Sequence, residues 1–315
     1  MPHALVLPMA APATRSASRR VARDAAAVAT GPLGALSHDE LGVVVDGLAD
    51  PLQPVVAVAL SSTCLGLRTP LRAALEVLKE QHESSKALCR KVGACWLTLR
   101  HAEKLCWQGK GLTADDMATL GMLLRWLPRT WVLGLSGNRI GDAGVHALFE
   151  GLRLGTAPAV TFFNLSYNEV GPAGAEALAA ALHRGAMPKL EELHLDRNPL
   201  GNQGVAALAA PLHKLPALKK LYLSYCQIGD EGVASLVGDL GKDGFKALTT
   251  IFLEGNNITD AGFATLVSAI DGGRMPDIEK ITLFDGGNSA SSLAARRAIN
   301  DAISRAKVRR SSSRI

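Results

Sequence analysis

The sequence predicts an α/β solenoid of about seven strand-helix units, with a parallel sheet on its concave side, preceded by a small all-α module. Three observations predict this fold. A strand-like leucine motif recurs at nearly constant spacing, and a stretch with helical spacing follows each copy. Hydrophobic residues make up 48% of the chain but aromatic residues only 4%, which favours a core of aliphatic ladders.

The clearest unit begins at residues 190–200, which read L-x-x-L-x-L-x-x-N-x-L. In such a pattern a short strand and turn bury leucines from one edge, and Asn198 can hydrogen-bond free backbone groups in the turn. Residues 201–212 then space their apolar side chains as a helix does. One strand and one helix therefore form a single repeat.

The position of Asn198 recurs in both directions, in steps of 28 or 30 residues. The helical half recurs with it and opens on variants of Gly-Asp-x-Gly, as at 141–145 and 229–233. Seven registers agree, so the repeat extends over most of the chain. Their positions are Lys110, Asn138, Asn168, Asn198, Cys226, Asn256 and Gly286.

The long period and this helix start resemble the ribonuclease-inhibitor-like class of leucine-rich repeats, in which full α-helices line the convex side. The resemblance covers roughly residues 102–286, and its outer units match least well, as expected of caps that close a solenoid. We assign 101–290 to the solenoid and 291–315 to a cap helix and basic tail. The helix is expected at 292–306, and the basic serine run after it is expected to be a solvated tail, a nuclear-import signal or a kinase target.

The positive charge of the chain is concentrated at its two ends. The net charge is +5, but residues 1–37 carry +3 and residues 296–315 carry +6, which leaves −4 for the middle. A nucleic-acid-binding surface on the repeats is therefore not expected. No apolar run reaches the ~18 residues that a membrane span needs, so no membrane partner is expected either.

The leader and the cysteines bear on the compartment. The five cysteines are odd in number and include no C-x-x-C pair, which indicates reduced thiols in the cytoplasm or nucleus. Residues 1–35 are rich in Ala, Pro, Ser and Arg with a single acid, so they are either a disordered leader or an organelle transit peptide.

Residues 36–100 are expected to form a helical module. Residues 37–40 are a capping box, and Asp50-Pro51 interrupts the helical spacing that follows. The stretch resembles an F-box at Leu36, Leu41, Leu48-Ala-Asp-Pro51, Val56 and Ser61–Cys64, and departs from that family at Ser37 and Leu67. The resemblance implies a cullin adaptor as partner, bound by Leu36, Leu41, Leu48 and Pro51. The alternative is a helical cap on the first repeat.

The residues between the buried leucines should face outward on the sheet, because side chains alternate along a strand. All three tyrosines of the chain fall in these rows, on neighbouring repeats with charged residues between them. Aromatic anchors beside charged groups are typical of protein-binding surfaces. We therefore predict a partner-binding patch of Phe162, Tyr167, Glu192, His194, Asp196, Arg197, Tyr222, Tyr225, Phe252 and Glu254, although these rings could instead pack on one another.

The sequence offers no catalytic pattern. It contains no H-E-x-x-H, G-x-S-x-G or P-loop motif, and 238–242 is too short for the last. His194 and Asp196 could form an acid–base pair, but an exposed polar couple on a binding surface is favoured. We expect a scaffold without enzymatic activity, cofactor or metal.

Three functions fit such a scaffold, and one of them is a plain scaffold or an immune-type sensor fragment with no link to a ligase. The F-box resemblance implies the substrate receptor of a cullin-based ubiquitin ligase. The repeats also resemble those of the Ran GTPase-activating protein, which implies a regulator of a small GTPase. That family has more repeats and an acidic C-terminal tail, whereas this chain ends in a basic one.

Overall fold

The computed structural model describes residues 50–52, 54, 58, 72–150, 152, 157–238, 244–283 and 292–312. The chain divides into two compact units, Met1–Glu83 and Ser84–Ile315. Leu36, Leu41 and Leu48, on which the F-box hypothesis depends, lie outside the described residues, as does the capping box at 37–40. Pro51 is buried, and the adaptor contact stays a prediction.

The second unit contains a parallel sheet of seven strands, each paired with the next along the chain. Each strand has three residues, and consecutive strands pair without a register shift at equivalent positions of the repeat. The strands are β1 Lys104–Cys106, β2 Val132–Gly134, β3 Phe162–Asn164, β4 Glu192–His194, β5 Lys220–Tyr222, β6 Thr250–Phe252 and β7 Lys280–Thr282.

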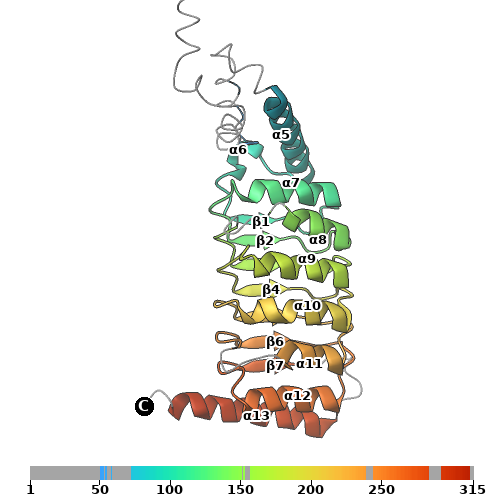
Figure 1. The fold of residues 1–315 in the computed structure, drawn as a ribbon, viewed down its shortest axis with the longest axis vertical. Helices are drawn as coiled ribbons and strands as arrows, with labels where there is room; N and C mark the ends of the chain where they lie inside the picture. The colour runs from blue at the N-terminus through green and yellow to red at the C-terminus, as the bar shows by residue number, and fades with distance from the viewer. Residues whose placement is uncertain are drawn as a thin grey trace, which may run out of the picture. The chain divides into compact units, whose positions relative to one another are not determined.

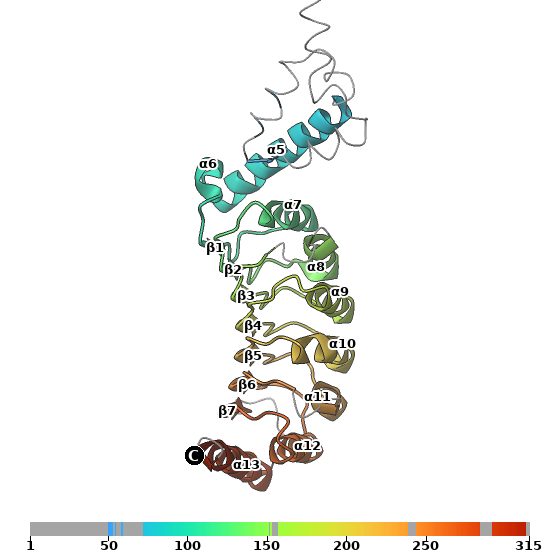
Figure 2. The same ribbon diagram turned by 60° about the vertical axis from the view of Figure 1, so that its left-hand side comes forward.

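One helix follows each strand of the sheet along the chain. In this unit the strands lie along one side and the helices along the other (Figures 1 and 2). The helices are α7 Ala114–Leu124, α8 Gly141–Glu150, α9 Pro172–His183, α10 Gly201–His213, α11 Asp230–Gly238 and α12 Asp260–Asp271; before them come α5 Arg72–Val92 and α6 Trp96–Leu99, and after them α13 Leu293–Ser312. This is the predicted α/β leucine-rich solenoid.

The core lies between the sheet and the helices. In β3 to β6 the central residue is buried and its two neighbours are half-exposed. The central residues Phe163, Leu193, Leu221 and Ile251 are completely buried. The opposite side of each strand is therefore left to face away from the helices.

The regular spacing of the asparagines along the chain reflects a ladder of buried hydrogen bonds. The Oδ1 atom of Asn198 accepts from the backbone N–H groups of Asn168 and Val170, both at 3.0 Å. Its Nδ2 atom donates to the carbonyls of Leu165 and Leu195, both at 2.9 Å. The expectation that this asparagine serves the turn is confirmed, and it serves the preceding turn as well. Equivalent bonds are made by Asn138, Asn168 and Asn256.

Cys226 occupies the same position in the fifth repeat. Its Sγ atom donates to the carbonyl of Leu195 at 3.2 Å, and burial raises the pKa of the thiol to about 12. The group therefore stays protonated at physiological pH. The four cysteines in the described part of the chain, two of them buried, form no disulfide.

A second ladder links the helix starts and explains the Gly-Asp-x-Gly pattern. Asp142 at the start of α8 accepts from the N–H groups of Gly171 and Gly174 in the next repeat, at 2.6 and 2.9 Å. Asp230 does the same for Thr259 and Gly262. A Cβ at Gly174 would lie 2.6 Å from Asp142 Oδ1, so glycine is needed where the carboxylate approaches. Each acid caps the following helix, and a negative charge is favourable there.

The C-terminal helix is longer than the sequence suggested. Helix α13 continues to Ser312, six residues past the expected end at Ala306. Arg309 donates to the carbonyls of Asp271 and Ile270, at 2.6 and 2.9 Å, and so satisfies the open end of α12. Residues 307–312 belong to the cap and not to a free tail.

Candidate binding site on the sheet

The strand side of the solenoid presents a row of rings. In the sheet register Asn164 lies beside His194, His194 beside Tyr222, and Tyr222 beside Phe252. These side chains flank the buried central residue of their strands, so they point away from the helices. Three predicted site residues are thus brought into one line by the register alone.

The rings of this row stack on one another. The centroids of His194 and Tyr222 lie 3.7 Å apart with planes 13° from parallel, and those of Tyr222 and Phe252 lie 4.1 Å apart at 7°. Phe162, from the neighbouring row of β3, contacts His194 at 4.7 Å and 45°. The distance between adjacent strands, roughly 4.8 Å, suits such stacking. We call Phe162, His194, Tyr222 and Phe252 the aromatic ladder.

Stacking determines which parts of the aromatic ladder are exposed to solvent. The ring faces cover one another, and each of the four side chains remains partly exposed. The interpretation that these rings pack on one another is therefore correct. It does not exclude binding, because the ladder still offers a continuous apolar edge on consecutive strands.

Charged groups line one side of the ladder. Lys220 Nζ lies 2.9 Å from Glu192 Oε1, and His194 Nε2 lies 3.5 Å from Glu192 Oε2. Burial is the largest influence on Glu192 and favours its protonated form, but the hydrogen bond and charge of Lys220, together with His194, outweigh burial and lower the pKa of Glu192. Burial lowers the pKa of His194 in spite of Glu192, so the imidazole is neutral at pH 7.

On the other side, two acids are held against the sheet by serines. Asp196 accepts from the N–H of Ser224 at 2.9 Å and from the hydroxyl of Ser166 at 3.3 Å. Glu254 accepts from the hydroxyl of Ser224 at 2.5 Å. Burial raises the pKa of Asp196. Among the described contacts His194 makes neither a hydrogen bond nor an ion pair to Asp196, so the two do not form an acid–base pair.

The turns that follow the strands carry the most exposed side chains of the site. Tyr167 is 55% exposed and Tyr225 38% exposed. The guanidinium of Arg197 lies between them, 5.2 Å from the first ring centroid and 4.0 Å from the second. We call these three residues the Arg197 sandwich. Sequence reasoning found its members but not their left-handed backbone, which the glycines at 109, 137 and 255 could have revealed.

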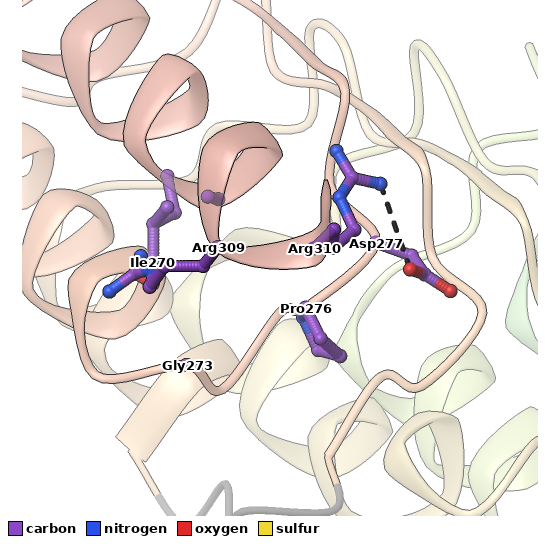
Figure 3. A pocket seen from close by; sticks show the side chains of 7 residues that line it. Ile270, Gly273, Pro276, Asp277, Arg309 and Arg310 are labelled. Carbon is purple, nitrogen blue, oxygen red and sulfur yellow. Dashed lines mark hydrogen bonds and ion pairs between the residues drawn. The ribbon is translucent and has the colours of Figure 1, made fainter. Parts of the chain in front are cut away.

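A separate hollow lies at the C-terminal end. It measures about 320 Å³ and is lined by Ile270, Gly273, Pro276, Asp277, Ala306, Arg309 and Arg310 (Figure 3). Arg310 lies 3.6 Å from Asp277 and donates to the carbonyl of Ile278 at 3.1 Å. Both arginines thus attach α13 to the preceding repeat, and the hollow offers no free functional group.

The described part of the chain contains no group of three His, Cys, Asp or Glu side chains that could hold a metal ion. Within the same residues, no helix combines the length and the hydrophobicity that a membrane span requires.

Comparison with known proteins identifies the repeats. The family model described as Leucine Rich repeat matches residues 132–149, 158–179, 186–209 and 214–237, which cover the repeats of β2 to β5. The chain therefore contains leucine-rich repeats. No curated protein matches the sequence.

Two solved structures show weak similarity. The tropomodulin C-terminal domain of Caenorhabditis elegans is 14% identical over 63% of this chain and 98% of its own, with a TM-score of 0.37. Actin-binding site 2 of leiomodin-1 is 11% identical over 74% of this chain and 92% of its own, with a TM-score of 0.32. No functional conclusion rests on similarity at this level.

Proposed function

We propose that this leucine-rich-repeat chain is a non-enzymatic interaction module that holds a segment of a partner protein on the strand side of its solenoid. The observation that carries the proposal is the aromatic ladder, four rings on four consecutive strands with charged groups on both sides. Aromatic residues surrounded by polar groups provide most of the binding energy in protein interfaces.

The ladder is also preorganised. Each ring is already fixed by its neighbours, so a partner would lose little side-chain entropy by packing on it. The ion pair of Glu192 and Lys220 at one margin can orient a partner without requiring burial of an unpaired charge. These properties favour binding over catalysis.

An affinity purification with a double variant tests the proposal. We expect Tyr222→Ala combined with Phe252→Ala to reduce partner recovery from the native cell extract by about tenfold or more. An effect of this size is expected when a binding hot spot is removed. Glu176→Ala, an exposed change on the helix side at α9, is the matched control and should leave recovery unchanged. Equal recovery by the double variant and the wild type would contradict the proposal, provided that both are folded.

We further propose that the partner is a substrate presented to a cullin-based ubiquitin ligase. This finer proposal is supported by the F-box-like pattern at Leu36, Leu41, Leu48 and Pro51 alone. A version lacking residues 36–71, which leaves α5 intact, should lose the ligase adaptor and retain the strand-side partner. Recovery of no adaptor by the full chain would remove the ligase proposal and leave the binding module.

The alternative is activation of a small GTPase, as the resemblance to Ran GTPase-activating protein repeats implies. Such a protein would accelerate GTP hydrolysis catalytically. A multiple-turnover GTPase assay on the recovered partner separates this alternative from the ligase proposal.

A further inference from the structure

Six consecutive turns of the solenoid share one backbone conformation. The residue just before each asparagine-ladder position has a positive φ, between 55° and 69°. Three of the turns have glycine there, at 109, 137 and 255. The other three, which are adjacent to one another, have Tyr167, Arg197 and Tyr225.

Large side chains are costly at these positions. A residue with a side chain is less stable in the left-handed region than glycine is, because its Cβ atom crowds the backbone. Glycine is evidently compatible with this turn, because neighbouring repeats use it. The exposed rings of Tyr167 and Tyr225 contribute little to the core. These three residues lie in consecutive repeats, and their exposed side chains contact one another.

Aromatic contacts hold the guanidinium of Arg197. Its Cζ atom lies 4.0 Å from the ring centroid of Tyr225 and 5.2 Å from that of Tyr167. Such contacts use none of its N–H groups as hydrogen-bond donors, and within the described residues the guanidinium makes no hydrogen bond or ion pair. By contrast, Arg139, two turns away, lies 3.8 Å from Glu169.

Two acids that precede turns of the Arg197 sandwich or its neighbour are bonded to other groups. Asp196 is bound to Ser224 and Ser166, and Glu254 is bound to Ser224. Both carboxylates are therefore directed toward the sheet. The positive charge of Arg197 remains available beside the aromatic ladder.

We propose that Arg197, held between Tyr167 and Tyr225, binds a carboxylate of the partner segment that lies on the ladder. This inference rests on the proposed function and specifies the partner as an acidic peptide. A planar guanidinium can hold a carboxylate by two parallel hydrogen bonds, and the contacts with the two rings restrict its motion beforehand. The carboxylate comes from an Asp or Glu side chain or from a free C-terminus.

An array of random synthetic peptides, half with free and half with amidated C-termini, provides the test. Wild-type protein should select peptides that carry Asp or Glu, or only peptides from the free half if the C-terminus is the ligand. Arg197→Gln should bind the selected peptides about tenfold more weakly, as expected for one charge-assisted hydrogen-bonded pair. Arg197→Lys keeps the charge but not the fork and should also lose affinity.

Two controls separate binding from folding. Arg139→Gln removes an arginine from the same region of turns and should bind as the wild type does. Combining Tyr167→Gly with Tyr225→Gly installs the residue found in the sister turns, so this variant should fold at least as stably and still bind more weakly.

The outcomes distinguish the two proposals. If the wild type selects peptides without regard to acidic groups, or if Arg197→Gln binds acidic peptides as tightly, the carboxylate assignment is wrong while the binding face stands. If Tyr222→Ala with Phe252→Ala leaves peptide binding intact, or if the wild type selects no peptide, the proposed function itself fails.

Discussion

At the scale of the residue, buried amides hold the turns of the solenoid together. The side chain of Asn198 forms five hydrogen bonds that join two successive repeats, and the residue is only 1% exposed. This side chain contributes to stability mainly through its partners, because two buried backbone N–H groups donate to its single Oδ1 atom.

We expect Asn198→Ala to lower the free energy of unfolding by about 3 kcal/mol, since it leaves the N–H groups of Asn168 and Val170 buried without an acceptor. Urea denaturation measures the change. Asn257→Ala, at an exposed position, is the control and should have little effect. A loss below about 1 kcal/mol would contradict the importance of the ladder.

The buried carboxylate of Asp196 leads to a prediction about how folding stability depends on pH. Burial raises its pKa in the folded state above the usual 3.8, so the folded protein takes up this proton first as the pH falls. Stability therefore rises on acidification through this window, and the ionised carboxylate reduces stability at neutral pH. Asn at this position does not titrate and can keep the bonds to Ser224 and Ser166.

Asp196→Asn should accordingly be more stable than the wild type near pH 7, and the difference should shrink as the pH falls to about 4. Urea denaturation of both proteins at several pH values measures it. A difference that stays constant or grows on acidification would show that burial does not dominate at this carboxylate.

At the scale of the element, the C-terminal helix is fixed by arginines. Arg309 binds the last carbonyls of α12, and Arg305 forms two bonds to Asp271, at 3.0 and 2.7 Å. Cations are favoured at a helix C-terminus, where carbonyl groups have no partner within the helix. The α13 cap is thus attached by polar contacts as well as by Ile299 and Ile303.

We expect Arg309→Ala to reduce stability by about 1 kcal/mol and to speed hydrogen exchange at the end of α12. Lys307→Ala is the control, because it removes one positive charge from an exposed position of the same helix and keeps the helix. Equal exchange in the two variants would mean that Arg309 does not anchor the cap.

The end of α13 also shows what the sequence could not predict. The apolar spacing of this helix fades after Ala306, because its last turns are held by side chains that bond to another element. Such a contact depends on the distance between α13 and α12, which no local pattern encodes. Local periodicity therefore located the start of the cap but not its end.

The same reasoning applies to the candidate site. The 28- and 30-residue steps placed Phe162, His194, Tyr222 and Phe252 on the outward face, and the register of the strands confirms this placement. The stacking of the rings could not be deduced, since it depends on side-chain rotamers. The left-handed backbone of the Arg197 sandwich can be predicted only by comparing repeats, because other turns have glycine at the equivalent position.

At the scale of the whole molecule, the solenoid unit is compact by itself. Residues Ser84–Ile315 form one unit, and every strand of the sheet lies within it. Stability in such an array is mainly a sum of contacts between neighbouring repeats.

A chain of residues 72–315, which keeps α5 complete, should therefore fold cooperatively and retain strand-side binding. Circular dichroism during thermal unfolding and peptide binding measure both properties. Aggregation of this chain under conditions in which the full protein is soluble would show that the N-terminal part is needed for folding.

Site-specific photo-crosslinking tests most directly whether a partner binds on the strand side of the solenoid. A benzophenone amino acid replaces Tyr222 in one protein and Ala206, exposed on the helix side of α10, in another. We expect position 222 to capture a partner in native extract, position 206 to capture none, and Phe252→Ala to weaken the capture. Capture of the same partner from position 206 and none from position 222 would contradict a binding site on the strand side.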